Sequence, residues 1–135
     1  MADTFWVEVV AADRLVWTGE ASQLLATTTE GDIGILAHHI PLIAALTVGT
    51  AEVTAADGTR HVVAVDGGFV SVTMTRTAII SPYAQLAADV DVDQARRQLI
   101  AAQARRDDGD NSIETLQAYK RAQAQIKAAE QYEQR

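Results

Sequence analysis

The chain has 135 residues, 48% of them hydrophobic and 21% charged, which fits one globular domain or a small domain with an appendage. Because it contains no cysteine, disulfides and thiolate metal sites are excluded. Its net charge of −7 gives no general attraction for phosphate backbones or anionic lipids, so nucleic acid is not an expected partner.

The N-terminal stretch MADTFWVEVVAAD lacks the basic segment of a signal peptide and the Arg/Ser richness of a transit peptide. No apolar run in the chain approaches the length needed to cross a bilayer. Any association with a membrane is therefore expected to be indirect, through a protein partner.

Residues 1–88 are predicted to form strands and turns, because they hold seven of the eight glycines and both prolines. The predicted strands are the alternating or β-branched runs 5–10, 46–53, 61–65, 69–74 and 78–81. Asp57-Gly58 lies between two of these runs and predicts a tight hairpin, since such turns need positive φ. Many short strands at turn-separated intervals indicate an antiparallel β-sandwich or barrel.

Residues 89–135 are predicted to form a second domain, an antiparallel hairpin of two helices, which makes the chain α+β. Asp91 is expected to cap the first helix, which ends at Asp107-Asp-Gly109, and 111–114 is expected to start the second with a capping box. The expected apolar stripes are Ala95, Leu99 and Ala102 on the first helix, and Ile113, Leu116, Tyr119, Ala122, Ile126 and Ala129 on the second.

The predicted hairpin has narrow, alanine-rich apolar faces, and alanine buries far less apolar surface than leucine. Such a hairpin is marginal by itself. It is expected to dock on the β domain, to dock on a partner, or to move between the two.

Catalytic motifs are missing. The chain has no Gly-x-Ser-x-Gly elbow, and Asp66-Gly67-Gly68 lacks the spacing of a phosphate loop. His38, His39 and His61 could in principle form a metal-dependent enzyme site, but adjacent residues on a strand point to opposite faces and no HExxH spacing is present. We expect no metal site and no enzymatic activity from this chain alone.

Two stretches resemble a known family. TEGDIGILAHHIPL (residues 29–42), followed by AVDGGFVSV (residues 64–72), is similar to the paired motifs of the epsilon subunit of bacterial F-type ATP synthase. There the pattern is Glu-Gly-acidic-aliphatic-Gly-aliphatic, then a His and Pro-Leu, and later Gly-Gly-Phe-aliphatic. The resemblance extends to residues 7–19 and covers nearly the whole chain.

The resemblance implies a flattened β-sandwich of about ten strands followed by two helices, in agreement with the pattern above. It also implies a non-catalytic rotor subunit of the central stalk, bound to the gamma subunit and the c-ring. The C-terminal helices would restrain ATP hydrolysis at the catalytic alpha and beta subunits, with Lys120, Arg121 and Lys127 approaching acidic surfaces. The expected location is the cytoplasmic face of a bacterial membrane.

The same resemblance assigns a docking loop for the c-ring and gamma, comprising Gly31, Asp32, Gly34, His39 and Pro41. Physically, Gly31 and Gly34 would let the chain turn, while Asp32 and His39 would make polar contacts. The aliphatic residues Ile33, Ile35 and Leu36 would anchor the loop in the sandwich.

Gly67, Gly68 and Phe69 form the second motif. The two glycines are expected to permit a bend or close strand packing, and Phe69 is expected to fill the core. Contact with gamma is the functional alternative for this motif.

Some bacterial members of the family bind ATP through an aliphatic-Asp-x-x-Arg-Ala motif, which residues 92–97 match except that Arg97 replaces alanine. Asp93 and Arg96, one turn apart, are candidates for binding the base and the phosphates, with Arg121 as a candidate helper. The alternative is an ordinary helix start with solvated arginines. No cofactor is required, and ATP would be regulatory.

A free-standing β-sandwich binding module with a dimerising helical tail is the alternative to the stalk subunit. A stable homodimer with no effect on any ATPase would favour it.

Overall fold

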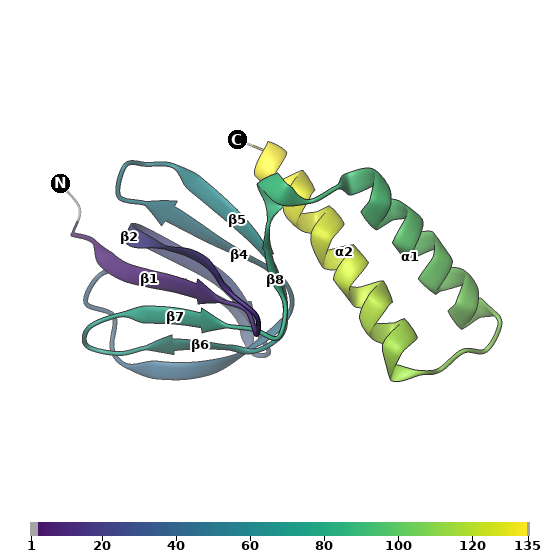
Figure 1. Ribbon diagram of the computed structural model, residues 1–135. Helices are drawn as coiled ribbons and strands as arrows, with labels where there is room; N and C mark the ends of the chain where they lie inside the picture. Colours follow the sequence, from purple (N-terminus) through teal and green to yellow (C-terminus); the bar gives the residue numbers. More distant parts are fainter. Residues whose placement is uncertain (1–2, 135) are drawn as a thin grey trace.

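The computed structural model describes residues 3–134 and contains a β-sandwich with a two-helix hairpin packed on one side (Figure 1). The strands are β1 (Phe5–Val10), β2 (Leu15–Thr28), β3 (Gly31–Ile35), β4 (Leu42–Ala55), β5 (Arg60–Asp66), β6 (Phe69–Val72), β7 (Thr77–Ile80) and β8 (Ala84–Leu86). They are followed by a 3-10 turn, η1 (Ala87–Asp89), and by the helices α1 (Val92–Asp107) and α2 (Ile113–Glu133). The predicted domain boundary after residue 88 falls within η1.

The sandwich is one eight-stranded sheet folded on itself, in the order β3-β2-β1-β7-β6-β4-β5-β8, with β2 also pairing with β4. β2 and β4 have 14 residues each, and each begins in the layer of β1, β7 and β6 and ends in the layer of β3 and β5. Because these long strands are continuous, the described chain has eight strands rather than about ten. The predicted fold class is confirmed, except that β1 pairs with β7 in parallel.

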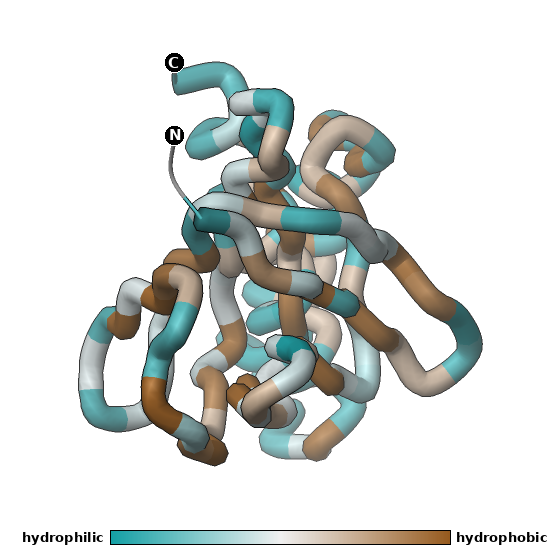
Figure 2. Tube along the Cα trace, turned by 90° about the vertical axis from the view of Figure 1, so that its left-hand side faces the viewer, coloured by the Kyte–Doolittle hydropathy of each residue, from teal (hydrophilic) through white to brown (hydrophobic). Residues whose placement is uncertain are grey.

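The core lies between the two layers and consists mainly of valine, leucine and isoleucine. Alternation along each strand sends every second residue inward. In Figure 2 the colour of the chain trace changes repeatedly between hydrophobic and hydrophilic. The layer of β1, β6 and β7 contributes four completely buried side chains to the core: Val7, Val9, Val70 and Ile79. The other strands, β2 to β5, contribute Leu24, Ile35, Val53 and Val63, which are also completely buried.

The helices cover the outer side of β4 and β5. In α2, Ala124 and Ala128 are buried against Val62 and Ala64 of β5 and Ala87 of η1, which form a small second apolar cluster. α1 packs on α2 and lies farther from the sandwich (Figure 1). The hairpin is therefore docked on the β domain through α2.

The predicted alanine faces are correct in part. Ala95 and Ala102 of α1 and Ala122 and Ala129 of α2 are buried. Ile113 and Leu116 are exposed, so the apolar stripe predicted for the first turns of α2 is wrong.

The predicted turns and caps are largely confirmed. Asp57 accepts a hydrogen bond from the Thr59 backbone N–H at 2.8 Å, and Gly58 has φ 89° in the β4–β5 hairpin. Asp91 caps α1 by accepting from the Gln94 backbone N–H. α2 is capped by Ser112, which accepts from the Thr115 backbone N–H, so the cap lies one residue later than predicted.

Candidate functional site

The predicted docking loop forms two separate bends. The first is the turn between β2 and β3, where Gly31 has φ 121° and Thr28 Oγ1 donates to the Gly31 carbonyl at 2.7 Å. Asp32 is exposed and accepts from Thr27 Oγ1 at 3.0 Å. Gly34 lies within β3, without a positive φ, so the prediction that it turns the chain is wrong.

The second bend is at 36–41, between β3 and β4. His38 has φ 67°, a conformation that is uncommon for any residue other than glycine, and its Nε2 lies 2.9 Å from a carboxylate oxygen of Asp3. His39 Nδ1 donates to the Ile40 carbonyl at 2.7 Å, and the exposed Pro41 leads into β4.

The anchoring of this loop differs from the prediction at one residue. Ile35 is completely buried and Ile33 packs against the core, as expected, but the Leu36 side chain is 58% exposed. Leu36 follows the last residue of β3, where alternation places the side chain away from the core.

Asp32 and His39 line different cavities. Asp32 belongs to a cavity of about 340 Å³ that also involves Lys127 and Gln131 of α2. His39 lines a groove at the end of the sandwich together with Trp6 and Met74. The two polar residues of the predicted docking loop therefore lie in separate hollows of the surface.

Gly67 and Gly68 allow close backbone packing, as predicted. Their φ angles are 71° and 94°, and a Cβ added to Gly68 would lie 2.0 Å from the carbonyl oxygen of Ile80. The Gly68 carbonyl accepts from the Leu46 backbone N–H at 2.8 Å. Position 68 therefore requires glycine for two reasons, the lack of space for a Cβ atom and the positive φ.

The prediction that Phe69 fills the core is wrong, because its side chain is 53% exposed. Phe69 pairs with Ala45 of β4 and Ile80 of β7, whereas the next residue, Val70, is completely buried. Alternation on a strand puts one of these two inside and the other outside.

Phe69 is part of an exposed apolar patch on the outer face of β4, β6 and β7. Ile43 is 76% exposed and Ile80 is 51% exposed on the same face. We call Ile43, Phe69 and Ile80 the sheet patch. The helices pack on the other side, on β4 and β5, and leave this face uncovered (Figure 1). Apolar patches of this kind mark protein-interaction surfaces.

A different group of residues connects α2 to the sandwich. Arg121 pairs with Asp66 of β5 at 3.0 Å through both Nε and Nη2, and its guanidinium carbon lies 4.7 Å from the ring centroid of Tyr83. Gln125 Nε2 donates to the Tyr83 hydroxyl at 2.7 Å. Burial raises the pKa of Tyr83 above its ordinary value. We call Asp66, Tyr83, Arg121 and Gln125 the Arg121 cluster.

A second polar cluster holds the C-terminal end of α2. The Arg60 guanidinium donates to Glu52 at 2.7 Å and to the backbone carbonyls of Gln131 and Gln134 at 2.7 and 2.8 Å. Carbonyls at a helix C-terminus have no partner inside the helix, so Arg60 satisfies groups that the helix leaves open. We call Glu52, Arg60 and Gln131 the Arg60 cluster.

The three residues predicted to bind ATP are not brought together. Asp93 and Arg96 lie exposed in the first turns of α1. Arg121 lines a cavity of about 440 Å³ with Tyr83 and Arg105, whose lining includes neither Asp93 nor Arg96. No local pattern indicated that Arg121 would pair with Asp66, which is 55 residues away.

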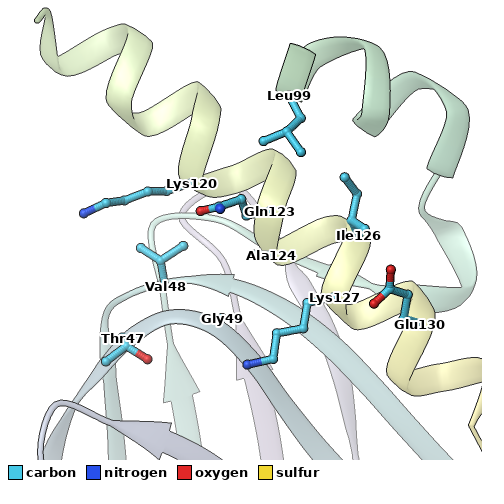
Figure 3. Close-up of a pocket in the computed structure, with 10 residues that line it drawn as sticks. All are labelled: Thr47, Val48, Gly49, Leu99, Lys120, Gln123, Ala124, Ile126, Lys127 and Glu130. Carbon is cyan, nitrogen blue, oxygen red and sulfur yellow. The ribbon is translucent and has the colours of Figure 1, made fainter. Parts of the chain in front are cut away.

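A larger cavity, of about 720 Å³, lies between the helices and β4. Its walls include Leu99 of α1, one turn after Arg96, and Lys120 and Lys127 of α2. Figure 3 shows both lysines extending from α2 on the side of Thr47 and Val48. Glu130 adds one carboxylate to the two ammonium groups, beside an apolar wall that includes Val48 and Ile126. The net positive charge of this lining suits an anionic ligand with an apolar part.

The histidines have separate environments. The His61 ring packs on Trp17 with centroids 5.1 Å apart, while His38 and His39 hold the contacts described above. Within residues 3–134, no three His, Asp or Glu side chains gather in a way that could hold a metal ion. Neither helix in this part of the chain has the length and apolar content to span a membrane.

The chain is similar to known proteins over nearly its whole length. Residues 4–87 match the family model of the ATP synthase delta/epsilon chain β-sandwich domain. The ATP synthase epsilon chain of Streptomyces coelicolor is 38% identical over 129 residues, covering 96% of this chain and 98% of that protein. The epsilon chain of Streptomyces avermitilis is 42% identical over 107 residues, covering 79% of this chain and 86% of the relative.

The fold is also similar to that of a chain in a solved assembly. A chain in the cryo-EM structure of the Euglena gracilis mitochondrial ATP synthase, OSCP/F1/c-ring, superimposes with a TM-score of 0.71. It is 19% identical, and the match covers 94% of this chain and 78% of that one. Because the two chains are only 19% identical, this similarity shows a shared fold.

Proposed function

The chain belongs to the ATP synthase delta/epsilon family as a non-catalytic subunit of the central stalk, and we propose that separate surfaces serve its different partners. The sheet patch binds the gamma subunit. The two bends of residues 29–42 face the c-ring. The helical hairpin regulates hydrolysis at the alpha and beta subunits. Membrane association at the cytoplasmic face is indirect, through the complex.

The observation that carries the gamma assignment is the uncovered apolar face of β4, β6 and β7. Three large apolar side chains lie on neighbouring strands, each more than half exposed. Fully burying a large apolar side chain contributes about 1.5–3 kcal/mol, and these side chains still have half or more of that surface to bury, so each offers about 1–2 kcal/mol before ordering costs. Helix α2 packs on β5 and on the later part of β4, where Thr50 bonds to Gln131, whereas Ile43 of the patch lies near the start of β4. Gamma and the docked hairpin therefore do not compete for the same surface.

The test is the affinity of Phe69→Asp for a gamma-containing subcomplex that lacks this subunit. A carboxylate inside an apolar contact should weaken binding by about thirtyfold or more, corresponding to about 2 kcal/mol. The matched control is Ile100→Asp, which changes an exposed isoleucine on α1. Equal effects of the two substitutions would contradict the assignment. A homodimer of the free chain that Phe69→Asp dissociates would favour the binding module instead.

We propose that the hairpin restrains hydrolysis only after α2 leaves the sandwich. In the docked form Arg121 is paired with Asp66, whereas Lys120 and Lys127 are exposed. Release would free Arg121 to join the two lysines against acidic surfaces of the catalytic subunits. Deletion of residues 89–135 should therefore raise the hydrolysis rate of the reconstituted complex. An unchanged rate would remove this role and leave the docking surfaces standing.

We further propose that ATP binds the docked hairpin through Asp93 and Arg96, with Lys120 and Lys127 in place of Arg121. Both lysines line the cavity between α1, α2 and β4, and Leu99, one turn after Arg96, lines it from α1. Asp93 and Arg96 lie outside this lining, so bound ATP would have to extend from the cavity along α1 to reach them. Calorimetry with and without Mg²⁺ should detect binding at millimolar ATP that the double variant Asp93→Ala, Arg96→Ala loses. Arg97→Ala is the control, because Arg97 is outside the matching part of the motif. Binding that both variants retain would remove Asp93 and Arg96 from the site.

A further inference from the structure

The sheet patch and the Arg121 cluster are connected by one buried serine. Ser81 directly follows Ile80, which is the last residue of β7 and a member of the sheet patch. Only 2% of Ser81 is exposed, so its hydroxyl is shielded from water and needs hydrogen-bond partners within the chain. These partners are backbone groups of the two residues that hold Arg121.

The Ser81 hydroxyl positions both residues that Arg121 contacts on the sandwich. It accepts from the Asp66 backbone N–H at 3.1 Å and donates to the Tyr83 backbone carbonyl at 2.7 Å. The Asp66 N–H also donates to the Tyr83 carbonyl at 3.1 Å, which closes a triangle of hydrogen bonds. Two corners of this triangle carry the carboxylate that pairs with Arg121 and the ring that Arg121 covers. A shift of Ser81 therefore moves the surface on which Arg121 docks.

A second connection between the patch and the cluster runs through Gly68. Asp66 stands two residues before Gly68 and three before Phe69 of the sheet patch. Gly68 packs so closely on the end of β7 that a Cβ there would lie 2.0 Å from the Ile80 carbonyl oxygen and 2.8 Å from the Ser81 Cα. Close-packed backbone transmits a displacement instead of absorbing it. The adjoining ends of β6 and β7 are therefore expected to move together.

This arrangement predicts the sign of a coupling between the two surfaces. Phe69 and Ile80 pair across β6 and β7, and each is more than half exposed. A partner that covers both side chains restricts the strand ends that lead to Asp66 and Ser81. Docked α2 needs the same strand ends in place. Each contact therefore lowers the ordering cost of the other, and the effect on the two binding free energies is reciprocal.

We infer that Ser81 is a positioning residue that couples the sheet patch to the docking of α2, so that gamma bound at the patch strengthens the docked hairpin. The inference rests on the proposed binding of gamma to the sheet patch. It gives a role in regulation to Ser81, which lies outside both sequence motifs. Loss of the gamma contact at the patch would make the hairpin easier to release.

The test is hydrogen exchange of the α2 backbone amides in the full chain, alone and bound to a gamma-containing subcomplex that lacks this subunit. Binding should slow this exchange about fivefold or more, the lower end of ordinary coupling between two sites. Ser81→Ala should lose most of the slowing, because the hydroxyl that holds Asp66 and Tyr83 is removed. The matched control is Ser22→Ala on β2, which removes a hydroxyl bonded to the Thr54 backbone carbonyl and should keep the slowing.

A second variant tests the coupling without disturbing the buried triangle. Arg121→Ala leaves the hydrogen bonds of Ser81 intact and removes the side chain that reads the positions of Asp66 and Tyr83. Exchange in this variant should be faster in the free chain, and binding of the subcomplex should no longer slow it. Arg106→Ala, whose contact with Tyr119 stays within the hairpin, should keep the slowing. If Ser81→Ala does not fold, Arg121→Ala decides alone.

Slowing that either variant retains in full would overturn the inference, because gamma would then protect α2 by covering it directly. Unchanged or faster exchange in the bound wild type would overturn it as well. The affinity of Phe69→Asp separates this inference from the gamma assignment. If that substitution still weakens binding, the sheet patch keeps its assignment and only the coupling is lost. If it binds like the wild type, both are lost.

Discussion

Replacing Arg121 by alanine should release α2 from the sandwich while leaving the sandwich folded. Arg121 is the side chain through which α2 makes an ion pair with β5, and it also covers the Tyr83 ring. The substitution leaves the Asp66 carboxylate, only 12% exposed, without its cation. The α2 helix itself does not need Arg121, because alanine has a higher helix propensity.

The free energy of docking that Arg121→Ala removes can be estimated from these contacts. A hydrogen bond to a charged partner contributes about 1.5–3 kcal/mol, and a partly exposed cation–π contact about 0.5–1 kcal/mol. Because Arg121 is 42% exposed, solvent screens the ion pair. We therefore expect Arg121→Ala to weaken the docking of α2 by about 2 kcal/mol in total. Opening of α2 should then become about thirtyfold more frequent.

Hydrogen exchange of the α2 backbone amides measures this opening directly. Arg106→Ala is the matched control, because Arg106 lies 4.6 Å from the Tyr119 ring centroid but the contact stays within the hairpin. Arg121→Lys should recover part of the protection, since it keeps the charge but not the forked geometry. Exchange in Arg121→Ala that matches the wild type, or equals that of Arg106→Ala, would refute the reasoning.

Three other predictions follow from the local geometry. Gly68→Ala should lower the free energy of unfolding by about 3 kcal/mol or more in denaturant titrations, whereas Gly58→Ala, with a similar φ but open space around it, should cost only about 1 kcal/mol; equal losses would mean that φ alone matters. Hydrogen bonds from Ser112 and Thr115 lower the pKa of Asp110 from 3.8 to about 2, so this stabilisation of the α2 start is complete above pH 4 and is lost as pH falls through 2. An NMR titration of the Asp110 carboxyl checks this, and an ordinary midpoint near 4 would contradict it. Arg60→Ala should fray the last turn of α2 by about 1–2 kcal/mol in hydrogen exchange without loosening its first turns, and uniform loosening would contradict the local role.

Local patterns predicted the secondary structure well because they depend on neighbouring residues. The Asp57-Gly58 hairpin, the Asp91 cap and the end of α1 at Asp107 all rest on contacts within four residues. The parallel β1–β7 pair depends on which strands meet, which no local pattern encodes.

The wrong prediction that Phe69 is buried has a different cause. Alternation in the 69–72 run is real, but a period of two does not say which set faces inward. Phe69 is larger and more apolar than Ser71, which favoured an inward Phe69, yet Val70 and Val72 are the buried pair. A functional surface is where the rule that large apolar residues are buried is expected to fail.

The ATP candidates show the limit of transferring a motif. Asp93 and Arg96 are one turn apart, so the helix fixes their relation, and sequence could predict it. Arg121 lies on the other helix, and its position depends on how α2 docks on β5. In the sequence its partner Asp66 stands before Gly67 and Gly68, a pattern that indicates a turn and not an ion pair with a helix.

The alanine-rich interface of α2 explains how the hairpin can be ordered and still be releasable. Ala124 and Ala128 bury little apolar surface at about 25 cal/mol per Å², so exposing them costs less than exposing leucines. The Arg121 and Arg60 clusters then supply the specificity of docking through charged and polar groups. Such groups can be solvated by water or paired by a partner after release, whereas an exposed leucine face would promote aggregation. The docked state is therefore set mainly by contacts that another subunit can replace.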